Sequence, residues 1–564
     1  MKKTTLSLFF IAISSFLLAQ TIVSTQPQNK KIIFEEFTGV NCGFCPSGHT
    51  IANNLKSANP GNFFIITVHA GFTSIPNAGQ PNFQTTFGWP FVEQSGGNYF
   101  PSGTVNRTNF PTLAEVAGTT ILGRFDWATA VNIIKNEPSY VNVAASATID
   151  VQTRLLTVRV ETYYTGTSPV ATNRLNVALL QDNTLGFQAG GNLGNNYNHR
   201  HRLVHLLTGQ WGENITTTTS GTLVTRNYTY TIPAAYNNIP ALLEDMEIVA
   251  SIAEGNQKII SGNGCLPTFT GMLANDAKLF SLEPIGDQCA TTLSPKIVLQ
   301  NNGQNLLTNL PITYKINNGS DQVFNWTGNL SSFAKTTVLL PAVAYSALNS
   351  NTCVVTLPAD SNVSNNSASV SFAKAAQSTT LVTLEISPDN YGSEISWNIK
   401  NPAGTTVASG GPYPNNNTTL ISQQINLQPN ICYTFNMIDS YGDGIGSGSN
   451  FVKLTSSNNA VILNSNGLYG TGLARNFSTT AALSQNVYAK SKVTLLPNPS
   501  AGLLTLQSFD VVDVQITDVF GKVVFEKLKI NNGETIDLTN LQKNVYFAKV
   551  STAEAQVVQK IVLQ

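Results

Sequence analysis

Two cysteines near the start, Cys42 and Cys45, most constrain how this chain begins to fold. They follow the apolar segment 32–34, which predicts a strand, and they precede apolar positions over 51–58 that are spaced as on one face of a helix. A second apolar segment, 63–68, predicts another strand. The beginning of the chain therefore predicts a β-α-β unit with a cysteine pair where the helix starts.

The spacing of the two thiols allows a disulfide or a pair of free thiols. A cysteine at a helix N-terminus meets unpaired N–H groups and the positive end of the helix dipole, which favour the thiolate and lower its pKa below about 8.5. We therefore expect Cys42 to be the attacking nucleophile and Cys45 to be the more sheltered resolving thiol. The alternative is a structural disulfide that only closes a small loop.

The first 20 residues have the pattern of a secretory signal. Lys2 and Lys3 precede an apolar run over 6–18, and Ala19-Gln20 follows it. This pattern predicts a signal peptide over 1–20 rather than a membrane span. No later apolar stretch reaches the roughly 18 residues that a spanning helix needs, so we expect an exported protein without a transmembrane span.

The charge balance excludes some classes of partner. The chain has 31 Lys and Arg residues against 31 Asp and Glu residues, and only 11% of its residues are charged. Such a chain has no field to attract nucleic acid or anionic membranes, so we expect neither as a partner. The length of 564 residues predicts about four or five domains. The plentiful Asn, Thr, Ser and Gly are typical of an extracellular chain of strands and turns.

The order of a strand, Cys-x-x-Cys, a helix and later the segment 100–105 before a strand resembles the thioredoxin fold. The resemblance implies that Pro101 is a cis-proline facing the cysteine pair. It also implies that Glu36, six residues before Cys42, is a buried acid that carries a proton to or from Cys45. The alternative for Glu36 is a solvated strand residue. A helix from Trp127 that ends before Pro138 closes this domain, which we place at 30–137.

A closer resemblance covers about 30–285. The segments 35–39, 46–49 and 105–107, together with Pro101, make the chain similar to the thioredoxin-like outer-membrane protein family of Bacteroidetes, the 28-kilodalton type. This resemblance implies a fold and a compartment far more than an activity.

From Val141 the hydrophobic period changes to two, which predicts antiparallel strands and a β-sandwich domain over 138–285. His199, His201 and His205 lie in this region and could hold a metal. Their cluster contains no acid or cysteine, and arginines are interleaved, so we favour a packing role. Residues 290–374 resemble an immunoglobulin-like surface module.

Two similar turns, 389–394 and 439–444, lie in the segment 377–480, which resembles the jelly-roll modules of secreted Bacteroidetes proteins. Asp439 and Asp443 offer hard oxygen ligands around glycines, as Ca²⁺ requires. The alternative is a pair of ordinary Asp-Gly turns. We expect no other cofactor.

The last segment, 488–564, resembles the type A sorting domain of type IX secretion. The resemblance is carried, in order, by residues 496–502, 514–522, 544–550 and 560–564. It implies that the secretion machinery is a partner. It also implies that, after periplasmic transit, the protein is secreted or held at the outer-membrane cell surface.

We thus expect a multidomain chain, α/β plus all-β, with a thioredoxin-like N-terminal domain followed by β-sandwich and immunoglobulin-like modules. One functional hypothesis is thiol-disulfide exchange with a protein thiol substrate through Cys42 and Cys45, assisted by Pro101 and Glu36. The other is a non-enzymatic surface adhesin or binding protein with its own surface ligand. Export permits disulfides. Among the remaining cysteines, Cys265 and Cys289 could bridge, while the pairing of Cys353 and Cys432 is open and free thiols are an alternative.

Overall fold

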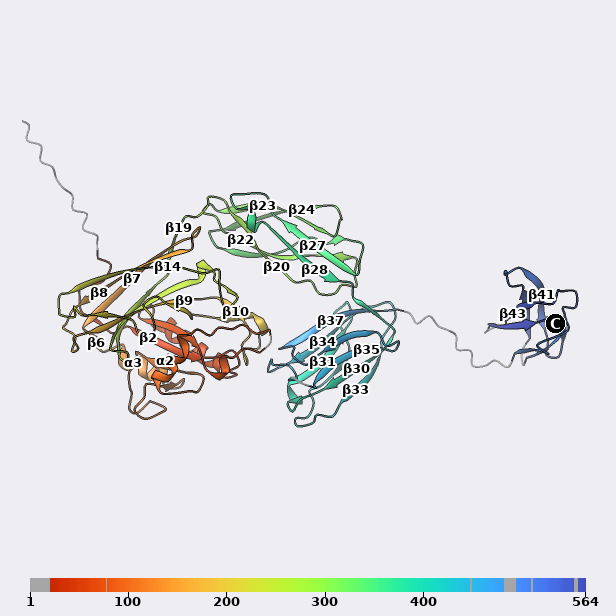
Figure 1. The fold of residues 1–564 in the computed structure, drawn as a ribbon, viewed down its shortest axis with the longest axis horizontal. Helices are drawn as coiled ribbons and strands as arrows, with labels where there is room; N and C mark the ends of the chain where they lie inside the picture. The colour runs from red at the N-terminus through yellow and green to blue at the C-terminus, as the bar shows by residue number, and fades with distance from the viewer. Residues whose placement is uncertain (1–20, 78, 447–448, 481–492, 509–510, 552–555) are drawn as a thin grey trace, which may run out of the picture. The chain divides into compact units, whose positions relative to one another are not determined.

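The computed structural model describes residues 21–77, 79–446, 449–480, 493–508, 511–551 and 556–564 (Figure 1). The signal peptide expected over 1–20 lies outside these residues. The chain divides into two compact units, 1–480 and 481–564.

The first unit begins with a sheet of nine strands. They are β2 (Ile32–Thr38), β3 (Phe63–His69), β4 (Ser102–Val105), β5 (Leu122–Gly123), β9 (Asn173–Gln181), β12 (Arg202–Leu206), β13 (Glu213–Ile215), β17 (Met246–Glu254) and β18 (Ile259–Cys265). Their order is β18-β17-β9-β12-β3-β2-β4-β5, and β13 pairs with β9. Strand β12 runs parallel to β3 and antiparallel to β9, so it joins strands from distant parts of the sequence.

This sheet corrects the expected fold class. A mixed α/β plus all-β chain with a thioredoxin-like N-terminal domain was expected, but the described residues form 44 strands and only three α-helices. The strands within 30–137 do not make a sheet of their own. β3 pairs with β12, and the same sheet extends beyond β12 through β9, β17 and β18. The chain is therefore mainly β, and a thioredoxin-like α/β domain at its start is not evident.

The helices cover parts of the nine-stranded sheet. They are α1 (Cys45–Ala58), α2 (Gly88–Ser95) and α3 (Trp127–Ile134). Every residue of β2 and β3 is buried, as is typical of parallel strands covered on both faces. Ile32 and Phe34 belong to a core with α1 and α3, whereas Ile33 and Phe37 belong to a core with α2. Because side chains alternate along β2, its apolar residues contribute to a core on each face of the sheet.

Short 3-10 helices occur in several connections of the first unit. They are η1 (Phe72–Ser74), η2 (Gly194–Asn196), η3 (Leu243–Asp245), η4 (Val363–Asn365) and η5 (Gly392–Glu394).

A second sheet packs near the first. Its strands are β7 (Val141–Asp150), β8 (Leu155–Tyr164), β14 (Leu223–Thr231) and β19 (Thr268–Thr270), in the order β14-β8-β7-β19. Leu156, Val158 and Val160 alternate along β8 and share a buried core with β9 and β17. The hydrophobic period of two that begins at Val141 therefore corresponds to the face of this sheet that is buried in the core. Three two-stranded pairs border this region: β1 (Gln28–Asn29) with β6 (Pro138–Ser139), β10 (Thr184–Gly186) with β11 (Tyr197–His199), and β15 (Ala235–Tyr236) with β16 (Ile239–Pro240).

The next strands form two sheets around their own core, which contains Ile297, Ile312 and Cys353. One sheet has the order β20-β22-β25 and the other β24-β23-β27-β28, while β21 pairs with β26. This two-sheet arrangement fits an immunoglobulin-like module. The strands are β20 (Ala277–Leu282), β21 (Thr292–Leu293), β22 (Lys296–Asn301), β23 (Leu307–Ile316), β24 (Gln322–Leu330), β25 (Lys335–Leu339), β26 (Val343–Ala344), β27 (Ser350–Thr356) and β28 (Ser367–Ala373).

The strands within 376–479 form another pair of sheets, with Trp397, Phe435 and Leu454 in the core between them. Their orders are β29-β37-β34-β31-β32 and β33-β30-β35-β36. The strands are β29 (Ala376–Ser378), β30 (Leu381–Ser387), β31 (Ile395–Lys400), β32 (Thr406–Gly410), β33 (Ile421–Asn426), β34 (Cys432–Asp439), β35 (Phe451–Ser456), β36 (Val461–Ser465) and β37 (Gly472–Thr479).

The second unit is a small two-sheet structure around Leu495, Ile516 and Ile561. Its sheets have the orders β38-β39-β42 and β41-β40-β43-β44. The strands are β38 (Thr494–Leu496), β39 (Leu503–Gln507), β40 (Val512–Thr517), β41 (Val523–Ile530), β42 (Thr535–Asp537), β43 (Val545–Ser551) and β44 (Gln556–Val562).

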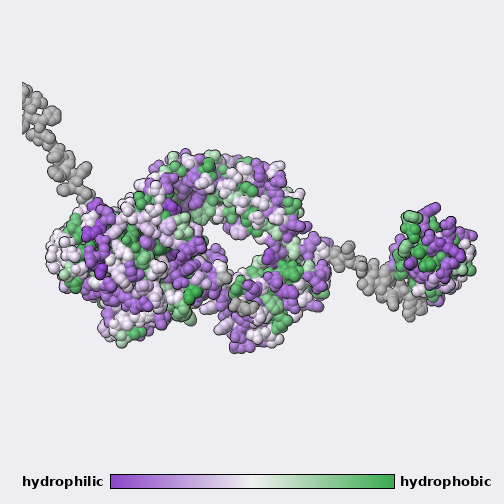
Figure 2. Space-filling view, viewed as in Figure 1, coloured by the Kyte–Doolittle hydropathy of each residue, from purple (hydrophilic) through white to green (hydrophobic). Residues whose placement is uncertain are grey.

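On the face drawn in Figure 2, hydrophilic and hydrophobic residues are interspersed over the first unit.

Candidate functional site

Cys42 and Cys45 form a disulfide, with their Cα atoms 5.4 Å apart. Strand β2 leads the chain toward the pair, and α1 begins at Cys45 itself, with Pro46 in its first turn. The N–H of Cys45 donates to the carbonyl of Cys42 at 3.1 Å, which closes a tight turn between them. The sequence therefore placed the pair correctly between a strand and a helix.

Both cysteines are buried. The exposed fraction is 4% for Cys42 and 0% for Cys45. The amide of Gln188 donates to the carbonyls of Gly39 and Cys42, each at 3.0 Å, and the N–H of Ala189 donates to Val40. The segment 187–190, far along the chain from the pair, therefore lies directly against the disulfide turn.

Two further contacts narrow the space around the turn. A Cβ atom added to Gly190 would lie 2.1 Å from the carbonyl oxygen of Gly43, so the two backbones approach closely. A Cβ atom added to Gly43 would lie 3.0 Å from the hydroxyl of Tyr441. Only Phe44 within the turn presents a largely exposed side chain, at 72%.

Glu36 and Pro101 meet beside helix α1. A Cβ atom added to Gly48, one turn along α1 from Cys45, would lie 3.3 Å from Glu36 Oε1 and 3.0 Å from Pro101 Cβ. The peptide bond from Phe100 to Pro101 is cis. The fold thus brings together Glu36 and Pro101, the two residues that the sequence predicted to assist the cysteine pair. Their catalytic roles stay predictions.

Glu36 is buried, not solvated, with an exposed fraction of 2%. Its Oε2 accepts a hydrogen bond from the hydroxyl of Thr67 at 3.4 Å, and its Oε1 has no hydrogen-bond partner in the structure. Burial raises the pKa of Glu36 to about 8, although the Thr67 bond acts in the opposite direction. At neutral pH this carboxyl group is therefore mostly protonated.

A polar cavity of about 260 Å³ adjoins Glu36. Among its lining residues are Glu36, His49, Thr67, Tyr197, His199 and His201. His49 bonds to the hydroxyls of Thr38 at 2.9 Å and Tyr197 at 2.7 Å. Burial lowers the pKa of His49 to about 4 and, together with His49, that of His199 to about 3, so both rings are neutral at pH 7. Nothing in the sequence pattern linked His49 to His199, because they meet only through the pairing of distant strands.

The three histidines of the predicted cluster have separate partners. The Nε2 of His199 lies 3.1 Å from the carbonyl of Phe187, and Nδ1 of His201 lies 2.8 Å from Glu247. The ring of His205 stacks on Tyr230, with the ring centres 4.3 Å apart. They form no metal-holding group within the described residues, which favours the packing interpretation.

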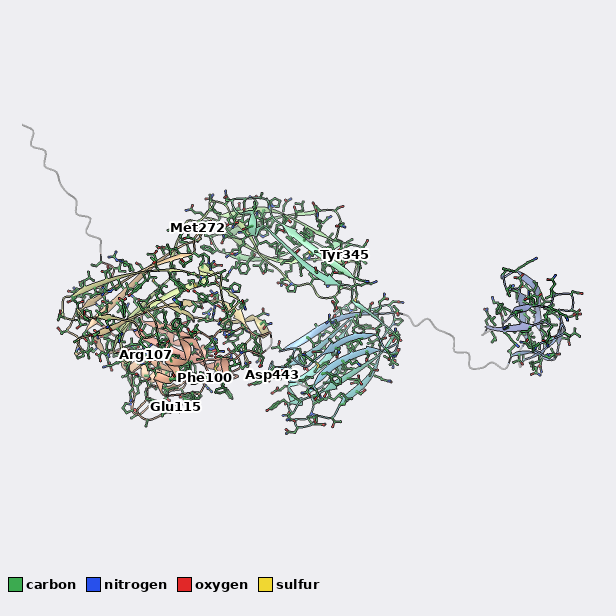
Figure 3. The ribbon with its side chains drawn as sticks, viewed as in Figure 1. Phe100, Arg107, Glu115, Met272, Tyr345 and Asp443 are labelled. Atoms are coloured by element: carbon green, nitrogen blue, oxygen red, sulfur yellow. A yellow bond between two sulfur atoms is a disulfide. The ribbon has the colours of Figure 1, made fainter. Side chains whose placement is uncertain are left out.

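The family-like segments 35–39 and 105–107 contribute a buried ion pair. Arg107 donates to both carboxylate oxygens of Glu35, at 2.5 to 3.1 Å, and both side chains are nearly inaccessible. The guanidinium also lies over the ring of Phe91, 4.7 Å from its centre. Figure 3 places Arg107 in the part of the molecule that holds the nine-stranded sheet. These residues therefore fix β2 to the segment after β4.

The remaining cysteines pair differently from the suggested bridge. Cys289 forms a disulfide with Cys432, while Cys265 and Cys353 are free thiols. The bridge joins the segment after β20 to β34. The suggested pairing of Cys265 with Cys289 is therefore wrong. Strand β37, which pairs with β34, holds the segment next to Cys289 through Arg475 and Asn476, which both bond to Asp287.

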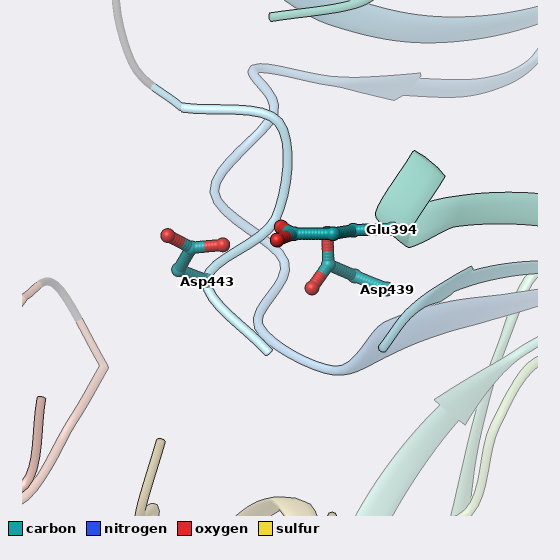
Figure 4. Close-up of side chains that lie close together, drawn as sticks. All are labelled: Glu394, Asp439 and Asp443. Atoms are coloured by element: carbon teal, nitrogen blue, oxygen red, sulfur yellow. The ribbon is translucent and has the colours of Figure 1, made fainter. Parts of the chain in front are cut away.

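The predicted metal ligands lie together, with one addition. Asp439 and Asp443 form a group with Glu394, and one oxygen from each carboxylate lies within 4.8 Å of the others (Figure 4). The sequence did not single out Glu394 as a ligand. Its only signal was the similarity of the turns 389–394 and 439–444.

Two parts of the chain match known protein families. The family described as "Outer membrane protein Omp28" matches residues 91–261. The "Secretion system C-terminal sorting domain" matches residues 494–564. The chain carries an Omp28 domain and a secretion sorting domain. Neither match supports the thioredoxin-like part of the expected resemblance. None of the curated proteins matches the chain.

Solved structures give low similarity. HBP35 of Porphyromonas gingivalis is 16% identical, with a TM-score of 0.35, and the match covers 61% of this chain and 98% of that one. A domain of the outer membrane lipoprotein Omp28 from Porphyromonas gingivalis is 18% identical, with a TM-score of 0.18, and the match covers 23% of this chain and 91% of that one. Because both TM-scores are low, we draw no conclusion about the fold or function of this chain from either structure.

The Omp28 domain and the sorting domain indicate secretion to the outer membrane or cell surface, which confirms the predicted localisation. The sorting domain also implies interaction with the secretion machinery. Among the described residues, no helix combines the length and the apolar character that crossing a bilayer requires.

Proposed function

We propose that this exported protein is a non-enzymatic surface adhesin or binding protein in which Cys42 and Cys45 form a structural disulfide. The observation that carries the proposal is the burial of this pair, with exposed fractions of 4% and 0%. Thiol-disulfide exchange requires a thiolate to reach a sulfur atom of the disulfide. Segment 187–190 and Tyr441 lie against the backbone of the turn that carries the pair, which supports restricted access to it.

The surroundings of the disulfide support a stabilising role. It closes the connection between β2 and α1, the place where the chain enters the first helix. Strand β2 is itself held by the buried pair of Glu35 and Arg107. The sandwich modules that follow offer broad sheet faces for a surface ligand.

A second candidate function, thiol-disulfide exchange, is favoured by one observation, the protonated carboxyl group of Glu36 near α1. Starting from the disulfide, a thiolate of a protein dithiol would attack Cys42 Sγ and break its bond to Cys45. Cys45 would leave as a thiolate and take the proton of Glu36. The second substrate thiolate would then release Cys42, so that the substrate gains a disulfide and the pair is reduced.

The two candidates differ in how fast the pair reacts, and the half-buried bridge of Cys289 and Cys432 is an internal reference. We would expose the full chain to dithiothreitol, trap free thiols at intervals, and identify the alkylated peptides by mass spectrometry. A structural role predicts that Cys42–Cys45 is reduced at least about ten times more slowly than Cys289–Cys432.

A peptide dithiol provides the complementary assay for exchange. The non-enzymatic proposal predicts that the full chain oxidises it no faster than the Cys42→Ser variant. Oxidation that is lost in Cys42→Ser but kept in Cys289→Ser, together with rapid reduction of Cys42–Cys45, would instead establish exchange.

A further inference from the structure

The two similar turns of the sequence lie next to each other in the structure. Strands β31 and β34 pair antiparallel, and their register sets Ile395 opposite Asp439. The end of the first turn, Glu394, therefore lies beside the start of the second. The N–H of Ser440 donates to the carbonyl of Glu394 at 2.9 Å, which ties the two turns together.

The geometry of the three carboxylates suits a large, hard cation. One oxygen each from Glu394, Asp439 and Asp443 lies within 4.8 Å of the others (Figure 4). Oxygen ligands of Ca²⁺ lie at about 2.3–2.6 Å from the ion, so ligands across the ion from each other are at most about 5 Å apart. One Ca²⁺ ion could therefore contact all three side chains without a large movement.

Asp439 provides an independent sign that a ligand is needed. Its exposed fraction is 3%. Its Oδ1 accepts a hydrogen bond from the N–H of Gly442, but its Oδ2 has no hydrogen-bond partner among the described residues. A buried carboxylate oxygen without a partner is costly, and an adjacent cation removes that cost.

The charges around Asp439 also favour a bound cation. Asp443 and Glu394 lie close enough to Asp439 for their negative charges to repel its own. Among the residues that the structure describes, no ion pair joins a lysine or arginine to Glu394, Asp439 or Asp443.

We propose that Glu394, Asp439 and Asp443 form a Ca²⁺ site that fastens the turns 389–394 and 439–444 to each other. The glycine-rich second turn, with Gly442, Gly444 and Gly446 at positive φ, suits the irregular coordination of Ca²⁺ better than the strict octahedron of Mg²⁺. The observations that support this site do not depend on the function proposed above.

The site has a consequence for the disulfide turn. Tyr441 lies between Asp439 and Asp443 in sequence, and its hydroxyl lies against Gly43. A Ca²⁺ ion that orders the second turn therefore also holds Tyr441 over the turn between Cys42 and Cys45.

Hydrogen exchange of the full chain, followed by mass spectrometry, tests the site locally. At about 10 mM Ca²⁺, about a hundred times a dissociation constant of about 10⁻⁴ M, exchange that requires release of the ion slows about 100-fold. We expect this slowing in peptides that cover the two turns, and not with 10 mM Mg²⁺ at about the same ionic strength. Calorimetry on the same protein would give the affinity for Ca²⁺.

Matched variants separate the site from general effects of charge. Asp439→Asn and Glu394→Gln should each lose the Ca²⁺-dependent slowing, and the second serves if the first does not fold. Glu385→Gln, on strand β30 of the same module, should keep it. Equal slowing in wild type and both site variants, or no slowing and no binding heat in wild type, would overturn the proposal.

Discussion

At the residue scale, Glu36 shows how burial changes a group that the sequence could only name. It lies in β2, forms no ion pair with any described residue, and burial raises its pKa from 4.5 to about 8. Below pH 4.5 the group is protonated in both the folded and unfolded chain. Between about pH 4.5 and 8 the carboxyl group of Glu36 ionises only in the unfolded chain. The contribution of Glu36 to the free energy of unfolding therefore falls as the pH rises.

We therefore expect Glu36→Gln to remove this loss of stability. Relative to wild type, the variant should gain up to about 1.4 kcal/mol of unfolding free energy per pH unit between pH 5 and 8. Urea unfolding of both proteins at each pH measures the difference, which cancels the contributions of other titrating groups. A difference that stays constant over this range would show that Glu36 ionises normally in the folded protein.

At the element scale, the segment 187–190 packs against the turn that carries the buried disulfide. Gly190 has φ of +71°, and an added Cβ would lie 2.1 Å from the carbonyl oxygen of Gly43. Gly209 has a similar φ of +74°, with no atom within 4 Å of an added Cβ. The two glycines therefore share the same backbone strain on substitution, but only Gly190 has a neighbour that must move.

We expect Gly209→Ala to lower the free energy of unfolding by about 1–2 kcal/mol, through left-handed strain alone. Gly190→Ala should cost more and should also speed the reduction of Cys42–Cys45 by dithiothreitol, because segment 187–190 is displaced. Thiol trapping with mass spectrometry measures the second effect. Equal reduction rates in the two variants would mean that this segment does not protect the disulfide.

At the scale of the whole molecule, export and folding belong to different units. The sorting domain matches residues 494–564, which lie in the second compact unit. Both disulfides and the two largest hydrophobic cores lie in the first unit. Removal of 493–564 should therefore stop delivery to the cell surface and leave the melting of the first unit unchanged.

Fractionation of cells that express the full and shortened chains tests delivery, and calorimetry of both purified chains tests melting. A shortened chain that still reaches the surface would show that the export information lies elsewhere. A melting transition of the first unit that shifts by several degrees would show that its stability depends on the tail.

The sequence alone determined the features that depend on neighbours along the chain. The apolar segments of β2 and β3, the start of α1 at Cys45, the period of two in β8 and the motifs of the sorting tail are all local patterns. Local patterns can be read directly, because side-chain periodicity follows from backbone geometry. They also sufficed to place the protein outside the cell.

Only the tertiary structure decided what lies side by side. It joined β12 to β3, which replaced the expected α/β domain with a large mixed sheet, and it paired Cys289 with Cys432. It also brought Glu394 to Asp439 and laid segment 187–190 against Cys42. Such contacts depend on which strands pair across long stretches of chain. Many pairings are compatible with the same alternating pattern, so only the burial of the complete cores selects one of them.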